Sequence, residues 1–467
     1  MILDLGRFYQ ACNPSTPLDL GDPNNRPYYI DFSTVRGGKI VRTLGRTITT
    51  LSPDRPTCQL FTGHIGCGKS TELLRLKALL EEQNFEVVYF ESSEDLDMGD
   101  MDITDILLAI ARQVSEQLQR ASVNLQPRRF QSLLHDAVEF LQTPIDFSAQ
   151  ASVPGVGEFS ASSSGEVGFS LPLGIASLTA KTRESPKLRH RLRNFLEPRT
   201  AGILEAINQE LLDVANQQLK GQGKKGLVVI VDNLDRVHNQ AGPAGRLLPE
   251  YLFIDRGQQL RQLNCHLVYT IPLSLIFSSE CETLKNRLGG GITPKVLPMV
   301  PVKTRTGETF PLGMKLLRQM VLTRAFPQSS TEEQEEKIIQ LFQTPDLLDR
   351  LCQVSGGHMR NLLGMLFSCL QQEDPPFSRD ILEAVIRDRR DYLTTSIKDE
   401  EWELLYQVVT QQSVQGELEY LTLLRSMFVF EYRDSQGSWF ALNPALREHQ
   451  KFKQWLAQKA VRTPTPS

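Results

Sequence analysis

GHIGCGKS, at residues 63–70, matches the pattern GxxxxGK[ST] of a phosphate-binding loop. Glycines let the backbone wrap closely around a phosphate group and point successive N–H groups at it. In this pattern the lysine, here Lys69, reaches the β- and γ-phosphates, and the hydroxyl of Ser70 binds Mg²⁺. We therefore predict that the nucleotide is bound by this loop and the residue after it, namely Gly63, His64, Ile65, Gly66, Cys67, Gly68, Lys69, Ser70 and Thr71.

The residues on either side of the loop support this interpretation. TCQLFT, at residues 57–62, is typical of a short buried strand that enters the loop. A helix beginning after the loop would add the positive end of its dipole to the phosphate site. Leucines at helical spacing predict that helix: Leu73, Leu76, Leu79 and Leu80. Strand, loop and helix follow in the order that such a loop requires.

A second motif, LVVIVD at residues 227–232, predicts a buried strand that ends in an acid. Such a strand can deliver a carboxylate to the Mg²⁺ ion beside the phosphate loop. We predict that Asp232 and Ser70 are the protein ligands of this magnesium ion.

Hydrolysis also needs a carboxylate that orients or deprotonates the attacking water. The residue directly after Asp232 is Asn233, whose amide cannot accept a proton at neutral pH. Asp235 is the nearest remaining candidate for this catalytic role. An alternative of equal weight is that Asp235 is a structural partner of Arg236. The sequence therefore favours nucleotide binding with slow hydrolysis.

Further apolar runs alternate with helical patterns along the chain. FEVVYF (85–90) and CHLVYTI (265–271) predict strands, and residues 102–118 predict a helix. This alternation indicates a parallel α/β sheet. Thr270 falls at a predicted strand tip, where a polar side chain can contact the γ-phosphate or the attacking water. Another strand is expected at 295–300.

These motifs, taken in order, resemble an AAA+ ATPase, and in particular the archaeal replication-origin initiators and the STAND and KAP ATPases. The string DNLDR at 232–236 is especially similar to KAP and STAND members. The resemblance covers residues 28–455 and implies ATP as the nucleotide, since no guanine-reading NKxD motif is present. The motifs that carry it are the phosphate loop, the strand ending in Asp232, the strand ending near Thr270, Asn286-Arg287-Leu288 and Gly356-Gly357-His358-Met359-Arg360.

The resemblance implies roles for individual residues. Thr270 would occupy the sensor 1 region, and Arg360 would be the sensor 2 arginine, which reaches from a helical lid to the phosphates. Arg287 would be an arginine finger acting on a neighbouring subunit, which implies a homo-oligomer. Arg36 would lie in the segment that borders adenine. Asn233 departs from the Asp-Glu pair of AAA+ ATPases, which again favours slow hydrolysis.

The patterns divide the chain into five parts. Residues 391–460 contain two predicted helices followed by two short strands, an order that resembles a winged helix. Within the core, residues 28–31 predict a strand and residues 35–50 a helix. The predicted parts are an irregular arm (1–27), a P-loop ATPase core (28–300, with an insertion at about 148–195), a helical lid (301–390), the winged-helix-like domain (391–460) and a disordered tail (461–467).

The charge of the winged-helix-like part bears on its partner. DNA-binding winged helices are usually basic, because phosphate neutralisation supplies much of the affinity. Residues 396–461 instead carry seven basic and nine acidic side chains. This balance favours a protein partner or a structural role, and DNA, although still open, is not favoured.

The predicted insertion leaves two questions open. Residues 148–180 are rich in Gly, Ser and Ala, and predict either an inserted hairpin or a mobile loop. The run that follows is either a solvated helix face or a contact with nucleic acid or with a neighbouring subunit's nucleotide. Its basic residues are Lys181, Arg183, Lys187, Arg189, His190, Arg191 and Arg193.

Composition excludes some other classes. The chain has 467 residues, 40% of them hydrophobic, and a net charge of −4, which gives no general argument for nucleic acid or an anionic membrane. The seven cysteines show no zinc-binding spacing and favour a reduced, cytoplasmic protein. No apolar run approaches the roughly 20 residues of a transmembrane helix, and residues 1–7 lack the pattern of a signal peptide.

Three functions remain open at this stage. In the first, ATP binding moves the lid against the core and changes what the winged helix contacts, with slow hydrolysis as a timer. In the second, the chain is an ATPase that loads onto or remodels DNA through the basic run. In the third, the protein binds a nucleotide and never hydrolyses it. We favour the first, a nucleotide-dependent molecular switch.

Overall fold

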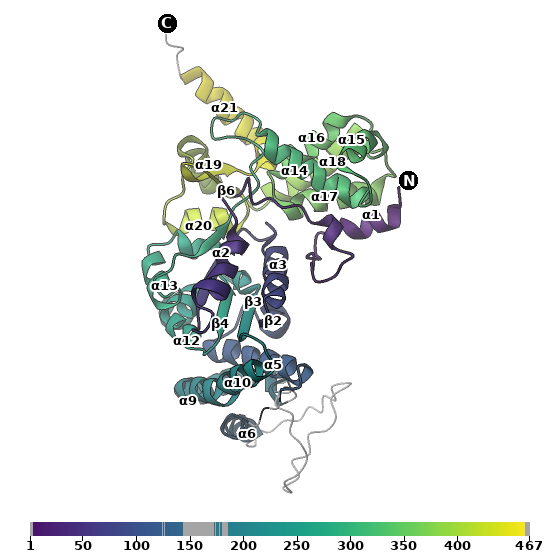
Figure 1. The fold of residues 1–467 in the computed structure, drawn as a ribbon. Coiled ribbons are helices and arrows are strands. Elements are labelled where there is room, and N and C mark those ends of the chain that lie inside the picture. The colour runs from purple at the N-terminus through teal and green to yellow at the C-terminus, as the bar shows by residue number, and fades with distance from the viewer. Residues whose placement is uncertain are drawn as a thin grey trace.

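A central parallel sheet organises the computed structural model, which describes residues 3–123, 125, 127–142, 172, 174–176, 178–179 and 185–462. The sheet has five strands in the order β2-β3-β4-β1-β5, and all neighbouring strands are parallel. Figure 1 labels three of them, β2, β3 and β4. The predicted α/β fold is thus confirmed. The strands are β1 (Cys58–Gly63), β2 (Glu86–Glu91), β3 (Leu227–Asp232), β4 (His266–Thr270) and β5 (Lys295–Leu297), the last ending before residue 300.

Helices cover both faces of this sheet. Successive side chains of a strand point to opposite faces, so Val229 and Val231 pack with α5 and α10, while Val228 and Ile230 pack with α2 and α3. Burial on both faces explains why β3 is apolar until Asp232. The helices are α2 (Ile40–Arg46), α3 (Lys69–Glu82), α4 (Ser92–Asp95), α5 (Ile103–Arg120), α6 (Arg128–Gln142), α8 (Pro186–Leu196), α9 (Thr200–Ala206), α10 (Asp213–Gly221), α11 (Leu248–Glu250), α12 (Gly257–Arg261) and α13 (Cys281–Arg287).

The parallel order brings the two principal motifs to one edge of the sheet. β1 ends at Gly63, where the phosphate loop begins, and β3 ends at Asp232. Because the strands are parallel, both motifs leave from the carboxyl edge, with only β4 between them. This edge is where open α/β sheets bind ligands.

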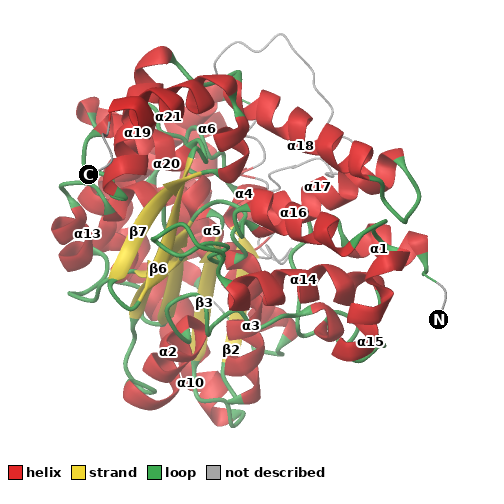
Figure 2. Ribbon diagram, turned by 90° about the horizontal axis from the view of Figure 1, so that it is seen from above, coloured by secondary structure: helices red, strands yellow, loops and turns green. Residues whose placement is uncertain are grey.

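The chain after residue 310 is mostly helical. Its helices share one hydrophobic core with α1 (Leu5–Ala11) and with the C-terminal region. Figure 2 shows α14, α16, α17 and α18 grouped on one side of the molecule. On the other side lie α19 (Asp399–Gln411), α20 (Leu418–Arg425) and a β-hairpin. The helices are α14 (Pro311–Ala325), α15 (Thr331–Glu336), α16 (Pro345–Ser355), α17 (Met359–Gln372) and α18 (Arg379–Thr394).

The C-terminal region has the predicted helices and hairpin. They are α19 (Asp399–Gln411), α20 (Leu418–Arg425), and the antiparallel pair β6 (Val429–Asp434) and β7 (Gly437–Leu442). A further helix, α21 (Gln450–Arg462), was not predicted; it takes in the first two residues of the predicted tail, and 463–467 lie outside the described residues. The hairpin side chains Phe430, Tyr432 and Trp439 belong to the core that contains α2 and α3. The hairpin therefore packs directly on the nucleotide-binding part.

The N-terminal segment differs from its prediction. It contains a helix, α1 (Leu5–Ala11), which is held by the fully buried Phe8 in the core of the helical region. Residues 28–31 form no strand, since Tyr28 ends a 3₁₀ turn, and the helix expected from residue 35 begins at Ile40. Local pattern missed α1 because burial against distant helices stabilises it.

Most of the predicted insertion, at about 148–195, lies outside the described residues, and this includes most of residues 148–180, which were predicted to be a hairpin or a mobile loop. Across the described part of the chain, no helix combines the length and the apolar character needed to span a membrane.

Candidate nucleotide site

A cavity opens at the carboxyl edge of the sheet, between the phosphate loop, the N-terminal segment and α17. Its walls include residues 65–72 of the loop and of α3, residues 14–18, and Arg360. Most of the predicted nucleotide-binding residues line it; of the loop, only Gly63 and His64 do not.

The phosphate loop has the backbone that a bound anion requires. Gly66 and Gly68 have φ angles of 83° and 105°, which side chains with a Cβ rarely adopt. At Gly63 a Cβ would stand 2.5 Å from the carbonyl oxygen of Leu297. α3 begins at Lys69, so its free N–H groups and the positive end of its dipole face the loop. The residues present therefore fit a nucleotide phosphate chain.

Lys69 is buried and fully engaged. Its Nζ donates to the carbonyl oxygens of Gly63 (2.8 Å) and His64 (2.9 Å) and lies 3.0 Å from Oδ2 of Asp235. Burial opposes the charge of Lys69, but the carboxylate of Asp235 outweighs it and raises the pKa of the lysine. The structural partner of Asp235 is thus Lys69 and not Arg236.

Asp232 and Ser70 are brought together as predicted for a magnesium site. The Ser70 hydroxyl hydrogen-bonds the Asp232 carboxylate, which also accepts the Tyr89 hydroxyl at 2.9 Å and the Asn233 N–H at 2.7 Å. Burial, followed by the charge of Asp235, raises the pKa of Asp232. A cation beside this carboxylate would relieve both effects.

Asn233 positions an acid that sequence reasoning missed. It takes a left-handed conformation (φ 63°), and its amide donates to Oε2 of Glu91 at 2.6 Å. Glu91 ends β2 in register with Asp232, and it lines the cavity. Burial and the charge of Asp232 raise its pKa. The available signal was a second strand ending in an acid.

Thr270 and Arg287 do not line this cavity. The Thr270 hydroxyl is buried under the loop after β3, where it accepts the N–H of Leu234 at 3.0 Å. Arg287 is half-exposed on α13, with Nη1 3.9 Å from Oδ1 of Asp255. The single chain therefore does not test an arginine finger that acts on a neighbouring subunit, and the catalytic roles of both residues stay predictions.

Arg360 reaches the cavity from α17, and its backbone binds the phosphate loop. Its N–H donates to the carbonyl of Gly66 at 3.1 Å, and its Nε donates to the carbonyl of Pro14 at 3.3 Å. Burial and the charge of nearby Arg236 lower the pKa of Arg360. An anion in the cavity would offset this unfavourable environment.

The N-terminal segment closes part of the cavity, which sequence analysis did not predict. The Leu18 N–H donates to the hydroxyl of Thr71 at 3.2 Å, and Arg324 of α14 donates to the carbonyl of Ala11 at 3.0 Å. We call residues 13–18 the strap. The strap joins the helical region, through Arg360, to the first turn of α3.

Arg36 is a second cation beside the loop. Its Nη2 donates to the carbonyl of Cys67 at 2.8 Å, and its guanidinium lies over the ring of Phe32. Burial lowers the pKa of this guanidinium. The sequence placed Arg36 near adenine, whereas its closest polar contact is the phosphate loop.

The hairpin also contacts the phosphate loop. The Glu431 N–H donates to Nε2 of His64 at 2.9 Å, and His358 donates from Nε2 to the carbonyl of Ile65 at 2.7 Å. The ring of Phe430 stacks on His358 and meets His64 edge-on. Burial lowers the pKa of both histidines to about 3, so both rings are neutral at physiological pH.

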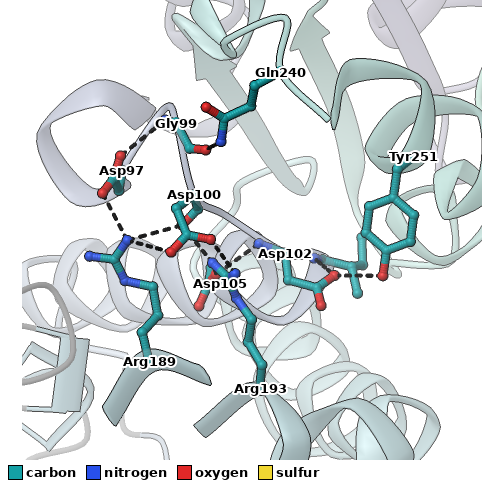
Figure 3. A network of polar contacts seen from close by, with 10 residues as sticks. Asp97, Gly99, Asp100, Asp102, Asp105, Arg189, Arg193, Gln240 and Tyr251 are labelled. Carbon is teal, nitrogen blue, oxygen red and sulfur yellow. Dashed lines mark hydrogen bonds and ion pairs between the residues drawn. The ribbon is translucent and has the colours of Figure 1, made fainter. Parts of the chain in front are cut away.

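Two arginines of the basic run pair with acids of the same chain. Arg189 pairs with Asp97 (2.8 Å) and Asp100 (2.9 Å), and Arg193 pairs with Asp100 and Asp105 (Figure 3). A purely solvated face is therefore wrong for these two arginines, since their partners are acids of the same chain. A contact of the run with nucleic acid or with a neighbouring subunit's nucleotide stays a prediction. Lys181 and Arg183 lie outside the described residues.

No family profile and no curated protein matches this chain. Three solved structures that resemble it are ORC or Cdc6 proteins. The ORC2 protein of Aeropyrum pernix, solved in ADPNP and ADP complexes, is 12% identical over 91% of this chain and 94% of its own, with a TM-score of 0.40.

The second is Cdc6p of Pyrobaculum aerophilum, at 12% identity over 98% of this chain and all of its own, with a TM-score of 0.35. The third is Drosophila ORC bound to DNA, at 10% identity over 97% and 91%, with a TM-score of 0.34. At these values the likeness concerns general architecture alone, and function is inferred from the cavity.

Proposed function

We propose that this chain is an ATP-binding molecular switch, in which the phosphate loop transmits its nucleotide state to the helical region and to the hairpin. One observation supports this most directly. Three successive loop residues are bound by two other parts of the chain: His64 by the backbone of β6, and Ile65 and Gly66 by the start of α17, through its N-cap His358 and the backbone of Arg360. A change in this backbone on phosphate binding would alter all three contacts.

The residues for binding are those of the cavity. The loop amides would hold the phosphates, Lys69 would reach the β- and γ-phosphates, and Ser70 with Asp232 would hold Mg²⁺. Magnesium, when bound, neutralises the charge that develops on the phosphates. Arg360 would leave the carbonyl of Pro14 to bind phosphate, which would couple the strap and α17 to the nucleotide.

Slow hydrolysis is part of this proposal. Asp235 would orient the attacking water, but its carboxylate is neutralised by Lys69. Glu91 is the second acid of the cavity, and it accepts a hydrogen bond from Asn233. An ion-paired carboxylate is a weaker base, so hydrolysis would be slow for as long as Asp235 stays paired with Lys69, and a partner or a neighbouring subunit would be needed for rapid turnover.

Two measurements on the purified full chain test this function. ATP affinity and turnover are measured for the unmodified protein and for Lys69→Ala, with Lys77→Ala as a control on the same helix, where it makes only a partly exposed ion pair of 3.8 Å. We expect Lys69→Ala to abolish tight binding and Lys77→Ala to preserve it. Limited proteolysis with and without Mg·ATP then reports on the helical region. Tight binding that leaves every cleavage site unchanged would contradict a switch.

DNA association needs a different set of variants from the one that the sequence suggested. Charge reversal at Arg189 or Arg193 would break ion pairs, so a loss of DNA binding there could reflect misfolding. Lys187 and His190 are exposed on α8 and are the suitable positions. Salt-sensitive DNA binding that Lys187→Glu removes would favour the DNA-associated alternative.

A further inference from the structure

Arg36 is buried at the cavity with an unused donor. The residue is 3% exposed, lines the cavity, and uses Nη2 for the carbonyl of Cys67. Its Nε is enclosed and has no hydrogen-bond partner within the described part of the chain. A buried charged donor of this kind is costly unless a further group binds it.

The carboxylate that acts on Arg36, that of Glu72, already has other partners. It lies 3.5 Å from Nη1 of Arg75 and accepts the hydroxyl of Tyr29 at 3.0 Å. Lys69 differs in this respect, since Asp235 neutralises it. Of the two cations that contact the loop, Lys69 and Arg36, only Arg36 has no acid paired with it in the described residues.

The two cations contact opposite ends of the phosphate loop. Lys69 is bound to the carbonyls of Gly63 and His64, where the loop begins. Arg36 contacts Cys67, and its Nη1 lies 3.9 Å from where a Cβ of Gly68 would stand, where the loop ends and α3 starts. In such a loop the backbone N–H groups cradle the α- and β-phosphates, and the lysine reaches the β- and γ-phosphates. Arg36 therefore lies on the α-phosphate side.

We propose that Arg36 binds the α-phosphate of the nucleotide and so recognises the part common to AMP, ADP and ATP. This inference rests on the proposed nucleotide-binding function. It differs from an adenine-bordering role, because an arginine that contacts the base would also contribute to the binding of adenosine.

Competition binding against a fluorescent ATP analogue separates these roles. Adenosine, AMP, ADP and ATP are titrated into the full-length unmodified protein and the variants Arg36→Met, Arg36→Lys, Lys69→Ala and Arg42→Met. Arg42 is the matched control, since it is exposed on α2 close in sequence. The thermal melting of each variant is recorded first. If Arg36→Met is unstable, the ratio of the affinities for AMP and adenosine is measured on Arg36→Lys instead.

We expect Arg36→Met to lower the affinity for AMP, ADP and ATP by a similar factor, about tenfold for the loss of one charge-assisted contact. The affinity for adenosine should change by less than about twofold, because adenosine has no phosphate for Arg36 to contact. Arg36→Lys should retain part of the affinity that Arg36→Met loses. Lys69→Ala should lower the affinity for ADP and ATP and leave the affinity for AMP unchanged.

Two results would overturn the proposal while leaving nucleotide binding intact. The first is an equal loss for adenosine and AMP in Arg36→Met, which assigns Arg36 to the base. The second is unchanged affinity for all four ligands. Failure of the unmodified protein to bind any of the nucleotides would instead remove the proposed function, and this inference with it.

Discussion

Nζ of Lys69 and Oδ2 of Asp235 lie 3.0 Å apart, with both side chains buried. This ion pair occupies the lysine that a phosphate-binding loop presents to the nucleotide. Phosphate and Asp235 would therefore compete for one cation. The competition would free the carboxylate of Asp235 when nucleotide is bound, which is when a water-orienting acid is needed.

Asp235→Asn tests this relationship. Loss of a buried ion-pair partner should destabilise the nucleotide-free protein by about 3 kcal/mol, while ATP turnover falls and ATP binding is kept or strengthened. Urea unfolding with and without Mg·ATP measures the first effect, and phosphate release the second. Asp54→Asn is the control, because Asp54 is 78% exposed and pairs only with Lys220 at 3.4 Å. Equal stability of the two variants would argue against a competing ion pair.

Arg360→Ala should separate binding from coupling. The backbone contact to Gly66 survives this change, so ATP affinity should stay within about tenfold, or 1.4 kcal/mol. Protection of the helical region from protease by nucleotide should be lost. Arg379→Ala, at a 58% exposed side chain on α18, is the control. Full nucleotide-dependent protection in Arg360→Ala would show that another residue does the coupling.

Thr71→Val removes the acceptor for the Leu18 N–H and loosens the strap. One lost hydrogen bond of about 1 kcal/mol corresponds to nucleotide release about fivefold faster. Stopped-flow displacement of a fluorescent nucleotide measures this rate. Thr71→Ser keeps the hydroxyl and should release nucleotide at the unmodified rate. If Thr71→Val and Thr71→Ser release nucleotide equally fast, the strap does not slow nucleotide release.

Glu431 predicts a pH dependence of stability. Burial raises the pKa of this carboxyl from 4.5 to about 7, against the opposing effect of the Ser438 hydrogen bond. The unfolded chain loses this proton near pH 4.5 and the folded protein only near pH 7. Stability from this group is therefore greatest below pH 4.5, falls as pH rises to 7, and is level above that.

Glu431→Gln removes this titration. Its stability relative to the unmodified protein should rise between pH 5 and pH 7.5 by roughly 2 kcal/mol, on the order of the pKa difference. Urea unfolding at both pH values provides the measurement. Glu417→Gln, at an exposed acid, should leave the pH profile unchanged. A constant offset between Glu431→Gln and the unmodified protein would rule out this titration.

The sequence by itself determined the local elements with strong periodicity. The parallel α/β sheet, the helix after the phosphate loop, and the C-terminal helices and hairpin follow from apolar spacing and lie within a few residues of their predicted bounds. GxxxxGK[ST] located the phosphate loop, because its glycines and its lysine are required by backbone geometry and charge. A strand ending in Asp232 was equally local information.

Only the tertiary structure decided which distant residues contact each other. Asp235 pairs with Lys69, Arg193 pairs with Asp100, and α1 folds against helices more than 300 positions away. Arg36, Glu91 and the strap reach the cavity from separate segments. Such contacts depend on how the elements pack, and periodicity within one segment carries no information about the side chains of another.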